Sequence, residues 1–128
     1  MPERLIVVAP EPSDFHITRE QFLAAMPYWE PHARLAGSVS DDDPVDANIQ
    51  VDRPDEYFFQ IFHFQNERML STDGNWEQAV EFAIWAVNSF PKQGDGELWL
   101  VDQAYTGHVV LTPGMPAEAF ETTWVEHD

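Results

Sequence analysis

The chain lacks cysteine, has a single lysine and contains no long apolar run. Without cysteine it cannot form disulfides, thiolate zinc sites or cysteine nucleophiles, and this composition is compatible with a reducing cytoplasm. No apolar stretch approaches the roughly 20 residues of a membrane span. The apolar run from Leu5 to Ala9 is too short for the core of a signal peptide. We therefore expect a cytoplasmic protein that does not enter a membrane.

Basic residues are also scarce. Only 6 Lys and Arg stand against 23 Asp and Glu, which gives a net charge of -17 at neutral pH. Direct binding to nucleic acids or to anionic membrane surfaces is disfavoured, because both need cations that neutralise phosphates. Three interpretations of the acidity remain open: solubility or a high-salt proteome, a face complementary to a basic partner, and a cation site.

The chain nevertheless has the composition of a folded protein. Its 128 residues are 44% hydrophobic and 13% aromatic, which predicts a single globular domain over residues 1–128. Asn75 and Gln78 have the spacing of a capping box, so a helix is expected from Trp76. Apolar residues up to position 90 occupy more than one stripe of this helix, and only a covered helix tolerates that pattern. A second capping box at Thr18 predicts a shorter helix that ends near Met26.

The remaining apolar segments are predicted to be strands, and a last short helix is expected from Ala117 to about Thr123. Both faces of the segment Tyr57–Phe64 are mostly apolar, which favours a central position in a sheet. The order of elements predicts an α+β fold. We expect a mostly antiparallel sheet of five or six strands, with two main helices packed on one face and a short C-terminal helix. The predicted strands are Leu5–Ala9, 33–40, 47–51, Tyr57–Phe64, Leu98–Gln103 and His108–Leu111.

No residue pattern identifies a reaction. The histidines lack the spacing that places two imidazoles of a helix on one zinc ion, and the acidic loop 41–46 lacks the spacing of a calcium loop. His63 in the aromatic strand and His108 after the hairpin tip are candidate bases, the latter beside Asp102. They define an alternative function, a small-molecule-binding or enzymatic domain with a pocket near Tyr57–Phe64. The main prediction contains no catalytic residue, cofactor or metal.

Aromatic residues exceed the needs of a small core. The five Trp and three Tyr suggest that some reach the surface, where these side chains dominate protein interfaces. A binding face with aromatics inside a ring of carboxylates would suit a basic protein partner. The predicted contact residues are Asp41, Asp42, Asp43, Asp46, Glu97, Asp102 and Tyr105.

In size, acidity, α+β order and the strand Leu98–Asp102, the whole chain resembles the immunity proteins that bacteria produce together with polymorphic toxins. The resemblance implies a stoichiometric inhibitor, not an enzyme, that occludes the active cleft of a toxin. Such clefts are often lined with cations that hold a nucleic acid or a dinucleotide such as NAD. A second alternative is a DNA mimic directed at a nucleic-acid-binding protein. A homodimer through an apolar helix face is compatible with each of these functions.

Overall fold

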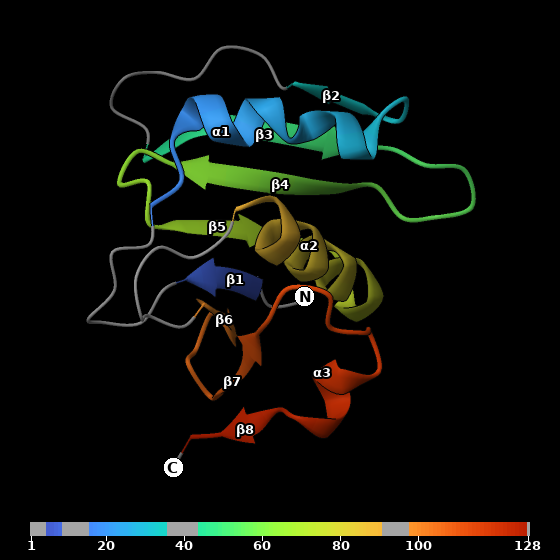
Figure 1. Ribbon diagram of the computed structural model, residues 1–128. Coiled ribbons are helices and arrows are strands. Elements are labelled where there is room, and N and C mark those ends of the chain that lie inside the picture. The colour runs from blue at the N-terminus through green and yellow to red at the C-terminus, as the bar shows by residue number, and fades with distance from the viewer. Residues whose placement is uncertain (1–4, 9–15, 36–43, 91–97, 128) are drawn as a thin grey trace.

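The computed structural model describes residues 5–8, 16–35, 44–90 and 98–127. The described strands form one eight-stranded sheet in the order β2-β3-β4-β5-β1-β6-β7-β8, and every neighbouring pair is antiparallel (Figure 1). The α+β class is confirmed, whereas the predicted number of five or six strands is too low. The strands are β1 (Leu5–Val8), β2 (Ala33–Leu35), β3 (Val45–Val51), β4 (Phe59–Phe64), β5 (Met69–Thr72), β6 (Leu98–Asp102), β7 (Gly107–Leu111) and β8 (Val125–Glu126).

The two strands missing from the prediction are short and weakly apolar. β5 contains Ser71 and Thr72 in its four residues, yet it lies between β1 and β4 near the middle of the sheet. β8 has only two residues and pairs with β7 at the edge. Their strand conformation depends on the neighbouring strands, and a local sequence pattern does not report such a dependence.

Helices α1 and α2 lie on one face of the sheet, where Figure 1 shows α1 in front of β3, α2 beside β5 and β1, and α3 near β8. The helices are α1 (Arg19–Ala24), the 3-10 helix η1 (Met26–Trp29), α2 (Trp76–Ser89) and α3 (Ala119–Thr122). Both predicted capping boxes are present, at Thr18 and at Asn75. The cap at Asn75 starts α2 at Trp76, as predicted, because it satisfies backbone donors that have no partner within the helix.

The core lies between the helices and the sheet and is rich in aromatic rings. Trp85 of α2 meets Phe22 of α1 and Trp29 of η1 at centroid distances of 6.1 and 5.5 Å. Trp29 in turn packs on Phe59 of β4 at 5.7 Å. The side chains of Phe22, Trp29 and Phe59 are almost completely buried. Part of the aromatic surplus is therefore explained by the core, which fixes α1, η1 and α2 to the strands below them.

Connections between strands gather at two ends of the sheet. One end carries the β3–β4 connection, the start of α2 and the β6–β7 connection, and we name it the acidic end. The other, the opposite end, carries the start of α1 and the β4–β5 connection. The strand register sets this division, because Val51 pairs with Phe59 at the first end and Val45 pairs with Phe64 at the second.

Candidate functional site

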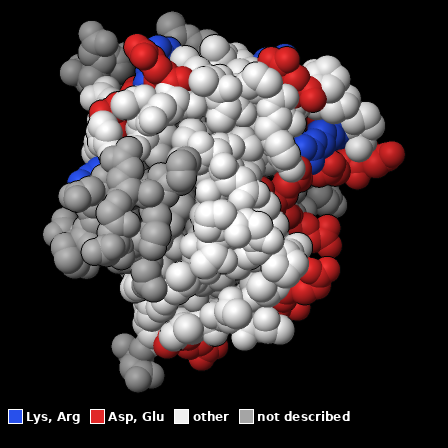
Figure 2. Space-filling model, viewed as in Figure 1, with Lys and Arg blue, Asp and Glu red and all other residues white. Residues whose placement is uncertain are grey.

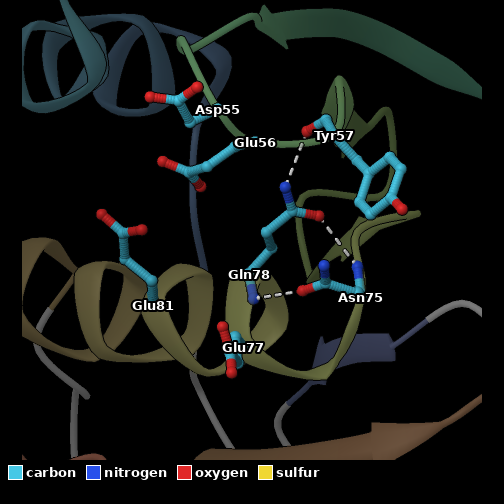
Figure 3. A pocket seen from close by; sticks show the side chains of 7 residues that line it. All are labelled: Asp55, Glu56, Tyr57, Asn75, Glu77, Gln78 and Glu81. Atoms are coloured by element: carbon cyan, nitrogen blue, oxygen red, sulfur yellow. Dashed lines mark hydrogen bonds between the residues drawn. The ribbon is translucent and has the colours of Figure 1, made fainter.

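A polar groove of about 330 Å³ lies at the acidic end, between the β3–β4 connection and the first turns of α2. Figure 3 shows the side chains of Asp55, Glu56 and Glu81 directed toward the same space, with Tyr57 on the far side of Gln78. Four carboxylates thus border one hollow, which makes it a strongly negative part of the surface. The groove is lined by Asp55, Glu56, Tyr57, Asn75, Glu77, Gln78 and Glu81.

The capping residues of α2 also hold the β3–β4 connection in place beside the groove. Gln78 accepts a hydrogen bond from the backbone N–H of Asn75 at 2.9 Å, and its side-chain amide donates to the carbonyl oxygen of Tyr57 at 2.7 Å. Gln78 is buried although its side chain is polar. Its two hydrogen bonds fix the β3–β4 connection against the start of α2, and these two segments form the walls of the groove.

Glu81 is the one groove carboxylate that is tied into a network. Arg53 donates to both of its oxygens, at 2.7 and 2.9 Å, and the hydroxyl of Tyr28 donates to one of them at 2.9 Å. Burial alone would raise the pKa of Glu81, but the hydrogen bonds from Arg53 and Tyr28 and the charge of Arg53 lower it below its ordinary value. Burial and the hydrogen bond to Glu81 raise the pKa of Tyr28. Glu81 is therefore held ionised, and the guanidinium of Arg53 is already engaged by this carboxylate.

The other three groove carboxylates have more freedom. Asp55, Glu56 and Glu77 are exposed, and Glu56 has only a 3.6 Å contact to Arg53. Of the arginines in the described segments, Arg53 is the one beside this groove, and its guanidinium already lies 5.1 Å from the centre of the Trp29 ring. Figure 2 shows the resulting concentration of Asp and Glu along the edge of the molecule where the β3–β4 connection lies. The groove therefore keeps an uncompensated negative charge.

Exposed aromatic side chains lie at the groove or next to it in sequence. Tyr57 is 81% exposed, Tyr28 54% and Phe58 49%, an unusual degree of exposure for side chains of this size. Tyr28 touches Glu81, and Tyr57 lines the groove. Aromatic groups beside carboxylates can bind Lys or Arg side chains through ion pairs and cation–π contacts together. The acidic end thus has the chemistry of a surface that binds cationic side chains.

The residues predicted to contact a partner are divided among different places. Asp41, Asp42, Asp43 and Glu97 lie outside the described residues. Asp46 lies at the opposite end, where its carboxylate pairs with His63. Asp102 and Tyr105 lie at the acidic end, in and after β6. Asp102 is buried and accepts hydrogen bonds from the backbone and hydroxyl of Thr106, whereas the ring of Tyr105 is 53% exposed.

The two histidines of the alternative pocket are also separated. His63 is completely buried, with Nδ1 against Asp46 and Nε2 2.6 Å from the carbonyl oxygen of Ile17. The two ring nitrogens thus tie β3 and the residue before the N-cap of α1 to β4, and His63 does not line the groove. His108 stacks on Trp99 of β6, and its Nδ1 lies 2.8 Å from Nε2 of His127. The structure does not bring His63 and His108 into one site.

Sequence reasoning missed the carboxylates of the groove. Asp55 and Glu56 belong to a turn, and Glu77 and Glu81 lie more than twenty positions further along the chain. One sequence pattern could have indicated two of them, namely the i,i+4 spacing of Glu77 and Glu81 on the exposed side of an otherwise apolar helix.

No family model, curated protein or solved structure matches this chain. Within the described segments, no helix has the length and apolarity to cross a membrane. The same segments contain no group of three or more His, Asp or Glu side chains arranged to hold a metal ion.

Proposed function

We propose that the chain is a protein-binding domain that captures a basic partner at its acidic end and inhibits that partner by covering a cationic cleft. The observation that carries this proposal is the groove itself, with four carboxylates and the exposed ring of Tyr57 along its walls. A lysine or arginine of the partner would enter the groove between Asp55, Glu56 and Glu77. This is the action of an immunity-type inhibitor, as the resemblance of the sequence implies.

The charge and the aromatics have separate roles in this function. A net charge of -17 accelerates encounter with a basic surface and selects against acidic proteins. Exposed rings such as Tyr57 and Phe58 bury apolar area after contact and slow dissociation. Glu81 would contribute mainly by position, because Arg53 and Tyr28 already hold its carboxylate. Tyr105, whose ring is exposed at the same end of the sheet, is a further contact candidate.

The decisive experiment compares two triple variants that change the net charge equally. The first, Asp55→Asn/Glu56→Gln/Glu77→Gln, neutralises the groove. The second neutralises three exposed carboxylates of α1 and the α3 region, as Glu20→Gln/Glu118→Gln/Glu121→Gln. Each protein and the wild type are co-expressed with the product of the adjacent gene and purified at low salt. Affinity and association rate are then measured for the retained basic protein.

We expect the groove variant to bind at least tenfold more weakly, because its lost charges face the partner directly. The α1 and α3 variant should lose only the small, salt-sensitive part of the affinity that depends on net charge. If both variants lose affinity equally, the groove is not the binding surface. If no basic protein is retained at low salt and a small molecule co-purifies instead, the inhibitor function is wrong and the pocket function replaces it.

A further inference from the structure

A second cluster of polar side chains lies away from the groove, where β8 brings His127 beside His108 of β7. Nδ1 of His108 and Nε2 of His127 are 2.8 Å apart, and the ring centroids are 5.0 Å apart. The ring of Trp99 stacks on His108 with a centroid distance of 3.8 Å and an interplanar angle of 15°. The imidazole of His108 in β7 and that of His127, directly after β8, therefore turn one nitrogen each toward the other.

The backbone fixes which nitrogen of His127 carries a proton. Its Nδ1 lies 2.8 Å from the carbonyl oxygen of Tyr105, which can only accept a hydrogen bond. Nδ1 of His127 is therefore the donor, and the lone pair of a neutral ring is on Nε2, facing His108. A metal-binding histidine typically has this arrangement, because a carbonyl that accepts from the second nitrogen fixes the tautomer and the ring orientation.

We propose that His108 Nδ1 and His127 Nε2 form a two-imidazole site for a divalent transition metal ion, with Cu²⁺ bound most tightly. Imidazole nitrogens bind Cu²⁺, Ni²⁺ and Zn²⁺, and the order of stability favours Cu²⁺. At metal–nitrogen distances of about 2.0–2.1 Å, two nitrogens on adjacent coordination positions lie about 3 Å apart. The observed separation of 2.8 Å is close to this value, and because the rings face each other nearly head-on, with centroids 5.0 Å apart, they must turn so that both lone pairs point at the ion.

Coordination replaces the hydrogen bond between the rings. The neutral ring of His108 changes tautomer, since the proton on Nδ1 passes to water while Nε2 takes one up from water. The lone pairs of His108 Nδ1 and His127 Nε2 then bind the ion. His127 is exposed, so water can complete the coordination. The bound ion would connect β8 to β7, and through the carbonyl of Tyr105 also to the β6–β7 connection. The site would thus fasten the C-terminal strand to the sheet.

The test is a titration of the full-length, untagged chain with Cu²⁺ in the presence of excess Mg²⁺, which occupies non-specific carboxylate sites. Isothermal titration calorimetry should give one equivalent of tightly bound Cu²⁺ for the wild type. His127→Gln removes an exposed ligand without entering the core and should weaken this binding at least tenfold. His108→Gln should do the same. His32→Gln changes another exposed histidine and should leave the affinity unchanged.

Two spectroscopic measurements test whether Cu²⁺ binds at His108 and His127. Electron paramagnetic resonance of the Cu²⁺ complex should show coupling to two imidazole nitrogens in the wild type and to one in His127→Gln. Cu²⁺ should quench the fluorescence of Trp99, since that ring stacks on His108. Trp99→Phe should remove much of the quenching while the calorimetric affinity stays within threefold. Equal Cu²⁺ affinity in the wild type and His127→Gln, or a spectrum with oxygen ligands alone, would overturn the proposal.

Discussion

The exposed carboxylates of the groove and the carboxylates of the opposite end are used in opposite ways. At the opposite end, Asp46 and Glu67 each pair with a histidine, namely His63 and His16. At the acidic end, no described Lys or Arg pairs with Asp55 or Glu77, and the one arginine beside the groove is engaged by Glu81. Carboxylates of the first kind connect elements of the fold. Carboxylates of the second kind contribute little to the fold and remain available to a partner.

The largest expected effect of a substitution concerns the pair at the opposite end. Asp46→Ala would leave the completely buried ring of His63 without its carboxylate partner. Because breaking a buried polar pair strands the remaining group, we expect the free energy of unfolding to fall by about 3 kcal/mol. Urea denaturation followed by tryptophan fluorescence measures this change.

Two further variants make this comparison specific. Asp46→Asn keeps an oxygen that can accept from His63, so it should cost less than Asp46→Ala. Glu77→Ala removes an exposed groove carboxylate and should change the stability by about 0.5 kcal/mol or less, as most surface substitutions do. The distinction between the two ends fails if Glu77→Ala destabilises the protein as much as Asp46→Ala.

A smaller effect on stability is expected for Glu81, which lines the groove but also connects elements of the fold through Arg53 and Tyr28. Glu81→Gln weakens the two-pronged bond to Arg53, and since the pair is partly exposed we expect a loss of about 1–2 kcal/mol at neutral pH. The lowered pKa of Glu81 predicts the pH dependence. Its contribution is fully present above the ordinary value of 4.5 and disappears as the pH falls through the lower pKa of the folded state.

Denaturation curves between neutral pH and pH 3 should therefore show a smaller acid-induced loss for Glu81→Gln than for the wild type. Glu56→Gln is the matched control, because Glu56 has only its longer contact to Arg53 and should keep the acid-induced loss of the wild type. An identical pH dependence of the wild type and Glu81→Gln would contradict the role assigned to the network of Arg53 and Tyr28.

The fold could be predicted from the sequence where the signals are local. Capping boxes at Thr18 and Asn75 identified the starts of both main helices, and the apolar segment at Tyr57–Phe64 indicated a central strand, observed as β4. β5 and β8 were missed because their strand conformation depends on neighbours that are distant in sequence. Local propensity carries no information about such pairings.

The sites could be predicted less well than the fold, for the same reason. The groove requires the β3–β4 connection to lie against α2, which depends on the hydrogen bond from Gln78 to the carbonyl of Tyr57. The histidine pair requires β8 to place His127 beside His108. Acidity and surplus aromatics indicated that a binding surface exists, but only the packing of the chain shows which carboxylates and rings are neighbours.

The smallest expected change in the free energy of unfolding comes from a pair of variants that compares the two ends most directly. Asp55 in the groove and Glu67 in the β4–β5 connection both have left-handed backbone, with φ of 65° and 60°. Glycine adopts this conformation without strain, so each substitution by glycine relieves a similar cost. Asp55→Gly also removes a charge that repels its neighbours. We expect it to raise the free energy of unfolding by about 0.5 kcal/mol.

Glu67→Gly removes the same kind of strain but also the 2.8 Å contact of Glu67 with His16. An exposed pair of this kind contributes about 0.2–1 kcal/mol, so the gain and the loss should nearly cancel and the variant should match the wild type. Urea denaturation is then repeated for His16→Gln and for His16→Gln/Glu67→Gly, because neither of these two proteins has the pair. There the gain should return to the value found for Asp55→Gly. If Glu67→Gly is stabilising even with His16 present, the carboxylates of the opposite end are no more important to the fold than those of the groove.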